Sequence, residues 1–179
     1  MRIAVLGGGR VGGALAATWR EHGHDVVVSQ RDTVAATAAH GEVVLLAVPA
    51  GAAAGVLAEA GSALDGTVVI DATNNLGGGL DGAAIAGLVP SARVVKAFNT
   101  VFSTYFHDTP PARPASLVFC GDDDEAKAST ARLIADAGFE PVDAGGSDRT
   151  PLLEALARLV IGIAYEQGRG PFVYRFEAS

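Results

Sequence analysis

The sequence predicts an α/β fold built on a doubly wound, mostly parallel sheet, and three observations support this prediction. Short apolar runs alternate along the chain with segments of helical spacing, as parallel strands and their crossover helices do. A glycine-rich turn, residues 7–12, separates the first apolar run from the first helical segment. Polar residues follow several of the apolar runs, at the carboxyl edge of the predicted sheet. Together these features indicate a Rossmann-type domain.

The stretch 3–12, an apolar run that stops in glycines and resumes with helical spacing, organises the chain. Its glycines follow the dinucleotide fingerprint Gly7-x-Gly9-x-x-Gly12. The first glycine allows a tight turn off the strand, the second lets a pyrophosphate approach the backbone, and the third lets the helix pack on the sheet. The helix that follows directs its free N–H groups and positive dipole end at the phosphates. The predicted dinucleotide-binding residues in this turn are Gly7, Gly8, Gly9, Arg10, Val11 and Gly12.

The choice of cofactor is made after the second strand, residues 25–29. A site specific for NAD normally places Asp or Glu there to bind the ribose 2′-hydroxyl, but this chain has Ser29 and Gln30, which are neutral. The next residue, Arg31, has a guanidinium that can bind a 2′-phosphate and stack on adenine. We therefore predict NADP, with Gln30 and Arg31 in its site; a solvated surface Arg31 is the alternative. Asp32 is interpreted as the N-cap of the next helix.

Strands and helices alternate along most of the remaining chain. The predicted strands cover residues 42–49, 67–71, 93–98, 115–120 and 140–143, and the predicted helices cover residues 11–22, 35–40, 52–64, 81–88 and 122–138. Ligands bind at the carboxyl ends of such strands, so the residues after the third, fourth and fifth strands are predicted to complete the site. These are Ala47, Val48, Pro49, Thr73 and Asn74 for the cofactor, and Asn74, Asn99 and Thr100 for the substrate. The glycine run 77–79 is predicted to form a lid.

The end of the chain differs in character, so we expect a dinucleotide-binding domain, residues 1–145, and a small appendage, residues 146–179. Residues 152–166 are apolar around most of a helical circumference, which a small domain cannot cover alone. We therefore expect this helix to form the contact of a homodimer. Residues 172–176 alternate in polarity and predict a last strand. The appendage is also expected to complete the acceptor site.

Composition argues against several classes of function. A net charge of -7 disfavours binding to nucleic acids and to anionic membranes, because both require a basic surface. The longest uncharged apolar stretch, residues 43–58, is too short to span a bilayer, and no signal peptide is recognised, so a cytoplasmic location is expected. The single Cys120 excludes an internal disulfide. The four histidines share no ligand spacing and are interpreted as surface or capping residues, so no metal site is expected.

Several short motifs together carry a resemblance to a known family. They are Arg2-Ile3-Ala4-Val5-Leu6-Gly7, Ala47-Val48-Pro49, Asp71-Ala72-Thr73-Asn74, Val95-Lys96-Ala97-Phe98-Asn99-Thr100, Cys120-Gly121-Asp122-Asp123 and Val142-Asp143-Ala144-Gly145. The chain resembles the NADP oxidoreductase family that includes the NADPH-dependent coenzyme F420 reductases, and it is similar to the cytosolic oxidoreductase domain of STEAP-type metalloreductases. The resemblance implies NADPH bound through Gly7–Gly12 and Arg31, with its nicotinamide beside Val48-Pro49. It also implies an acceptor ring near Asn74 and Asn99.

The function that we expect is hydride transfer between NADP(H) and a deazaflavin, coenzyme F420, or a flavin. Such a transfer mainly requires two stacked rings and the exclusion of water, and the sequence shows no acid–base or nucleophile constellation, so no catalytic residue is predicted. Two alternatives stay open. An NADPH-dependent reductase of a small imine or carbonyl would use Lys96 to polarise its substrate. A non-enzymatic NADPH-binding redox sensor would use the appendage to bind a partner.

Overall fold

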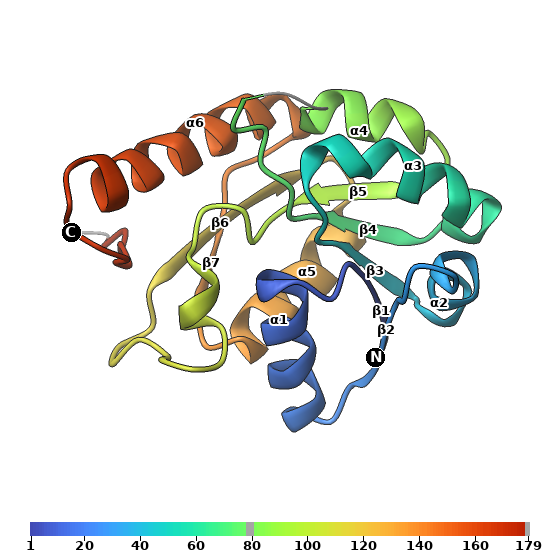
Figure 1. Ribbon diagram of the computed structural model, residues 1–179, viewed down its shortest axis with the longest axis horizontal. Helices are drawn as coiled ribbons and strands as arrows, with labels where there is room; N and C mark the ends of the chain where they lie inside the picture. The colour runs from blue at the N-terminus through green and yellow to red at the C-terminus, as the bar shows by residue number, and fades with distance from the viewer. Residues whose placement is uncertain (78–80, 178–179) are drawn as a thin grey trace.

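A computed structural model describes residues 1–77 and 81–177, which form a sheet with helices on both faces (Figure 1). Within these residues the sheet has seven strands in the order β2-β1-β3-β4-β5-β6-β7. They are β1 (Arg2–Leu6), β2 (Asp25–Val28), β3 (Val43–Leu46), β4 (Val68–Asp71), β5 (Arg93–Lys96), β6 (Ser116–Gly121) and β7 (Glu140–Asp143). The first five strands are parallel, and β6 runs antiparallel to β5. The predicted α/β, doubly wound and mostly parallel fold is confirmed.

The helices agree with the predicted ones to within a few residues. They are α1 (Arg10–Glu21), α2 (Val34–His40), α3 (Ala50–Ala60), α4 (Gly82–Leu88), α5 (Asp124–Asp136) and α6 (Thr150–Ile161). The side chains of Asp81 and Asp123 cap α4 and α5 by accepting backbone N–H groups. The predicted cap of α2 is wrong, because Thr33 and not Asp32 occupies that position. None of the helices in the two described ranges is long and apolar enough to cross a bilayer.

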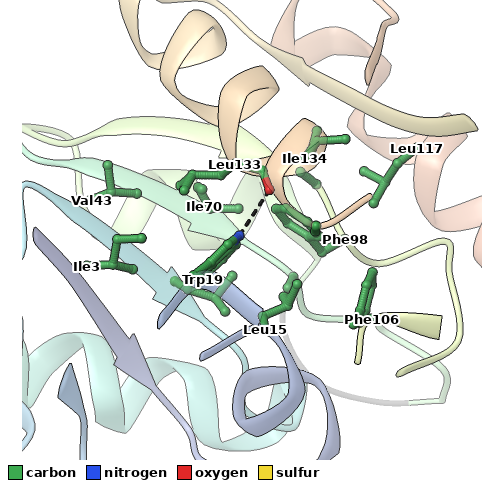
Figure 2. Packing of buried hydrophobic residues seen from close by; sticks show 14 of the residues in the cluster. Ile3, Leu15, Trp19, Val43, Ile70, Phe98, Phe106, Leu117, Leu133 and Ile134 are labelled. Atoms are coloured by element: carbon green, nitrogen blue, oxygen red, sulfur yellow. Dashed lines mark hydrogen bonds between the residues drawn. The ribbon is translucent and has the colours of Figure 1, made fainter. Parts of the chain in front are cut away.

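Apolar side chains on the two faces of the sheet form separate cores. On one face, α1 and α5 pack on the central strands around Trp19 (Figure 2). The indole Nε1–H of Trp19 donates to the Leu133 carbonyl oxygen at 3.0 Å, so this large buried side chain keeps its polar group paired. On the other face, α2, α3 and α4 cover the same strands with smaller side chains. Because β3 is buried along its whole length, its sequence is apolar without alternation.

The strand order places a ligand crevice beside β1. β2 lies on one side of β1 and β3 on the other, so the chain reverses its direction of progress across the sheet at this point. Open α/β sheets bind ligands at the carboxyl edge next to such a point. The loops after β1 and β3 meet there closely: a Cβ on Gly7 would lie 2.5 Å from the Ala47 carbonyl oxygen.

Helix α6 packs against β6 and α4 at the end of the chain (Figure 1). The predicted helix over 152–166 is confirmed, since α6 continues as one wider helical turn, Gly162–Glu166. The predicted strand over 172–176 is wrong. The segment joins β6 through hydrogen bonds at Ser116, from Ser116 N–H to Tyr174 O at 3.0 Å and from Phe176 N–H to Ser116 Oγ at 2.9 Å. β5 pairs with β6 only at Cys120 and Gly121, so the tail lies along the open part of that edge. Within the described chain it contacts β6 at Ser116 alone, and one contact point is too little for a ladder.

His24 is buried and not a surface residue. Its Nε2 lies 2.9 Å from Asp136 Oδ2 at the end of α5, and its Nδ1 lies 3.2 Å from the N-terminal ammonium group, so it links the two. The predicted lid over 77–79 falls largely outside the described residues.

Candidate functional site

A cavity of about 840 Å³ lies between the start of α1, the ends of β4 and β5, and α6. Its walls come from segments far apart in the sequence. The glycine turn contributes Gly9, Arg10 and Val11, the strand ends contribute Asn74, Asn99 and Thr100, and α6 contributes Ala157, Val160 and Ile161. The cavity therefore joins the predicted dinucleotide turn to the predicted substrate residues.

The three glycines of the fingerprint have different structural roles. Gly7 has a φ of +111°, and a Cβ on Gly12 would lie 2.0 Å from the Gly7 carbonyl oxygen, so both positions are dictated by the fold itself. A Cβ on Gly9, in contrast, would meet no protein atom within 4 Å. The open space at Gly9 faces the cavity, and it fits a pyrophosphate that must approach the backbone closely.

The start of α1 is electrostatically prepared for an anion. Gly9 caps this helix without a side-chain hydrogen bond, and the first turn contains no acidic residue, so its N–H groups stay available. Arg10 is the first residue of the helix and is exposed beside the cavity. Within the described chain, neither Arg10 nor Arg31 forms an ion pair that would occupy its guanidinium.

Two asparagines link the ends of β4 and β5 at the cavity. The amide of Asn74 donates from Nδ2 to the Asn99 carbonyl oxygen at 2.8 Å. Asn99 Nδ2 donates to Asn74 Oδ1 at 3.2 Å and to the Leu153 carbonyl oxygen of α6 at 3.2 Å. The orientation of the Asn99 amide is thereby determined, because both partners of its nitrogen are acceptors.

The turn that presents Asn99 contains the one non-glycine residue with positive φ in the described chain. Phe98 has a φ of +64°, in the left-handed region that costs a bulky residue conformational energy. Its ring is buried and packs edge-on against Trp19 and Phe106 at centroid distances of 5.6 and 5.8 Å, and this packing holds the strained turn. Strain maintained by the core in this way is common at functional sites.

The C-terminal tail closes another side of the site. The Tyr174 hydroxyl is bonded to Thr100 Oγ1 at 2.6 Å, and Tyr105 Oη donates to the Pro171 carbonyl oxygen at 2.9 Å. Burial raises the pKa of Tyr174, with the Thr100 hydrogen bond acting in the opposite direction. The tail is therefore joined to the segment that follows β5.

The structure brings some of the predicted site residues together and places others apart. Gly9, Arg10, Val11, Asn74, Asn99 and Thr100 line the cavity, whereas Ala47, Val48, Pro49 and Thr73 do not. Thr73 is buried, with an exposed fraction of 2%. Gln30 and Arg31 follow β2 on the far side of the glycine turn, to which they are connected by the Gly7 N–H donating to Ser29 Oγ at 3.3 Å. An extended dinucleotide could contact both regions.

The sequence did not indicate several residues of the cavity wall. They come from the segment after β5 and from the region after α6, and include Phe102, His107, Asp108 and Tyr165. His107 is exposed, as the sequence predicted, and it also lines the cavity, with Nδ1 3.5 Å from Thr18 Oγ1. The one feature of the sequence that could have indicated His107 as a cavity residue is its position downstream of the end of a strand.

Lys96 points away from this cavity into a buried ion cluster. Its Nζ lies 2.8 Å from Asp71 Oδ2, 2.7 Å from the Thr73 carbonyl oxygen and 3.5 Å from Glu154 Oε1. Its N–H groups are occupied by these acceptors, and the lysine is 2% exposed. In the described parts of the chain, no group of three His, Cys, Asp or Glu side chains is arranged to hold a metal ion.

A doubly wound sheet whose glycine turn opens into such a cavity defines a dinucleotide-binding protein of the Rossmann type. The family model described as NADP oxidoreductase coenzyme F420-dependent matches residues 2–40 and 32–75. The match covers less than half of the chain and includes the motifs at residues 2–7, 47–49 and 71–74. It agrees with the resemblance that these motifs carry to NADP-dependent oxidoreductases.

Solved structures extend the similarity beyond the matched region. A proposed F420-dependent NADP reductase from Arthrobacter sp. FB24 is 26% identical with a TM-score of 0.88, over 99% of this chain and 100% of that chain. A hypothetical protein from Sinorhizobium meliloti is 28% identical with a TM-score of 0.66, over 84% of this chain and 88% of that chain. A reductive aminase from Aspergillus terreus shares the fold, at 16% identity and a TM-score of 0.74, over 94% of this chain and 62% of that chain.

Proposed function

We propose that the protein transfers a hydride between NADP(H) and a deazaflavin, coenzyme F420, or a flavin. The observation that carries this proposal is the single cavity that extends from Gly9 to α6. One end has the backbone N–H groups and the guanidinium that a pyrophosphate requires. The other end has an apolar wall from Val160, Ile161 and Phe102, against which a planar ring can pack. The similarity to the proposed F420-dependent reductase supports this acceptor class.

In this proposal the chain binds the cofactor, orients the acceptor ring and shields both from water. The turn Gly7–Gly12 holds the pyrophosphate, and Arg31 binds the 2′-phosphate. When bound, the nicotinamide supplies the hydride. Asn74, Asn99 and Thr100 position the acceptor ring, while α6 and the tail exclude water from the two rings.

Reduction of a small imine or carbonyl is the second candidate, because such a substrate needs a proton donor and the cavity contains an imidazole. Lys96 does not favour this function, since its ammonium group is buried among acceptors outside the cavity. His107 does line the cavity and would be the donor.

The test is to measure loss of NADPH absorbance under anaerobic conditions with coenzyme F420, FMN, FAD or a cyclic imine supplied separately. Turnover with F420 or a flavin, retained in His107→Ala, supports ring-to-ring transfer. Turnover with the imine alone, lost in His107→Ala, would replace it with the second candidate. Tight binding of NADPH without turnover on any acceptor would instead indicate the redox sensor.

A further inference from the structure

The chain contains a buried cluster of three charged groups that the proposed hydride transfer does not use. Lys96 at the end of β5 lies between Asp71, at the end of β4, and Glu154, in the second turn of α6. Their side chains are 2%, 1% and 8% exposed, respectively. Burial of charges costs several kcal/mol per ion unless they are paired and hydrogen-bonded, so a cluster of this kind needs a structural or functional reason.

The charged groups of the cluster also form hydrogen bonds with the backbone of Thr73, next to the site. Asp71 Oδ1 accepts the Thr73 N–H at 2.9 Å, and Lys96 Nζ donates to the Thr73 carbonyl oxygen at 2.7 Å. Both polar groups of the Thr73 backbone are thus held by the cluster. The next residue is Asn74, which lines the cavity and pairs with Asn99.

The cluster also attaches α6 to the sheet. Glu154 Oε1 accepts the Gly82 N–H at 2.9 Å, so the start of α4 is tied to α6. The start of α4 packs closely against the start of α6, because a Cβ on Gly82 would lie 2.3 Å from Thr150 Cγ2. The residue before Glu154, Leu153, accepts the Asn99 amide through its carbonyl oxygen. Adjacent residues of α6 are therefore connected to the cluster and to the asparagine pair.

We propose that Lys96, Asp71 and Glu154 are positioning residues, which set the Asn74–Asn99 pair and the α6 wall so that the acceptor is held correctly. This inference rests on the proposed function for its catalytic consequence. Among the residues that the structure describes, the cluster reaches the acceptor side of the cavity through Thr73 and α6, and none of its hydrogen bonds or ion pairs involves the glycine turn or Arg31. Its loss should therefore impair use of the acceptor and leave NADPH binding intact.

Glu154 is the most informative position for a test. Its removal leaves Lys96 and Asp71 as a neutral pair, whereas removal of Lys96 would leave two buried carboxylates without their cation. Glu154→Ala removes the contacts with Lys96 and with the Gly82 N–H. Glu154→Gln keeps a side chain of the same length with an oxygen acceptor. Glu154→Asp keeps the charge but shortens the side chain, and it serves as the deciding variant if the alanine variant does not fold. Arg158→Ala, at an exposed position of the same helix, is the matched control.

Three quantities are measured for each variant: kcat/KM for the best acceptor, the Kd for NADPH, and amide hydrogen exchange of residues 72–76 and 97–101. In Glu154→Ala we expect kcat/KM to fall about tenfold or more, NADPH affinity to stay within about twofold, and exchange in both segments to accelerate. Glu154→Gln and Arg158→Ala should resemble the wild type.

Unchanged kcat/KM and exchange in Glu154→Ala would overturn the inference, and so would a parallel loss of NADPH binding. If the wild type turns over no acceptor, the proposed function fails, and hydrogen exchange alone decides the positioning role. In that case faster exchange at 72–76 and 97–101 supports positioning, and unchanged exchange rejects it.

Discussion

The hydroxyl of Tyr174 and Thr100 Oγ1 are joined by a 2.6 Å hydrogen bond that connects the C-terminal tail to the segment after β5. Thr100 is buried, so it has no water to replace this partner. We expect Tyr174→Phe to lower the free energy of unfolding by about 1–3 kcal/mol, because a buried polar group loses its hydrogen bond. Urea unfolding measures this change. Tyr165→Phe, at a side chain that is 63% exposed, should have no comparable effect.

Tyr174 should also make stability dependent on pH in the alkaline range. Burial raises the pKa of Tyr174 above its ordinary value of 10.0, so the phenol ionises more easily in the unfolded chain. Its contribution to stability is complete below pH 10 and is lost as pH rises through the folded-state pKa. The loss from this group is at most about 1.4 kcal/mol per pH unit. Unfolding of the wild type and Tyr174→Phe on both sides of this pH should show a smaller decline in the variant.

Arg31 should determine the preference for NADPH over NADH. A charge-assisted hydrogen bond to the 2′-phosphate contributes roughly 1.5–3 kcal/mol, so Arg31→Ala should weaken NADPH about 10- to 150-fold and leave NADH nearly unchanged. Titration calorimetry with both cofactors measures this. Arg2→Ala, at an exposed arginine at the opposite end of β1, is the control. Equal losses for both cofactors would contradict the assignment.

Gly9 and Gly12 should respond differently to alanine. A Cβ at Gly12 would lie 2.0 Å from a backbone oxygen, so Gly12→Ala should destabilise the fold by about 1–3 kcal/mol or more. Gly9 has a φ of -73° and no protein atom near its missing Cβ, so Gly9→Ala should fold normally. Its methyl group would occupy the space proposed for the pyrophosphate, and we expect NADPH affinity to fall about tenfold or more. If the Gly9→Ala protein folds and binds NADPH with wild-type affinity, the proposed position of the pyrophosphate is wrong.

The outer side of α6 should form the contact of a homodimer. Leu152 and Leu159 are two helical turns apart and are 58% and 60% exposed, which leaves apolar surface uncovered in one copy. Light scattering at micromolar concentration should give twice the chain's 18.1 kDa. Leu159→Glu should reduce the measured mass to that of the monomer, while Arg158→Ala should leave the dimer mass unchanged. A wild-type monomer would reject the prediction.

Local patterns in the sequence determined the strands, most helices and the glycine turn. An apolar run such as 43–46 has one stable environment, the inside of a sheet covered on both faces. Gly7 and Gly12 likewise follow from backbone geometry within a few residues of chain. The class of fold and the candidate cofactor turn could therefore be predicted without tertiary information.

Tertiary structure alone decided how distant segments share the site. Lys96 was a plausible polarising group until Asp71 and Glu154, which lie 25 and 58 positions away in the chain, surrounded it in the fold. The alternating segment 172–176 has the pattern of a strand, but in the fold it bonds to β6 at Ser116 alone and forms no ladder. His107 lies at the cavity wall because the segment after β5 packs against α1, where the Thr18 hydroxyl donates to the Phe106 carbonyl oxygen. Each of these outcomes depends on long-range packing and pairing, which periodicity along the sequence does not encode.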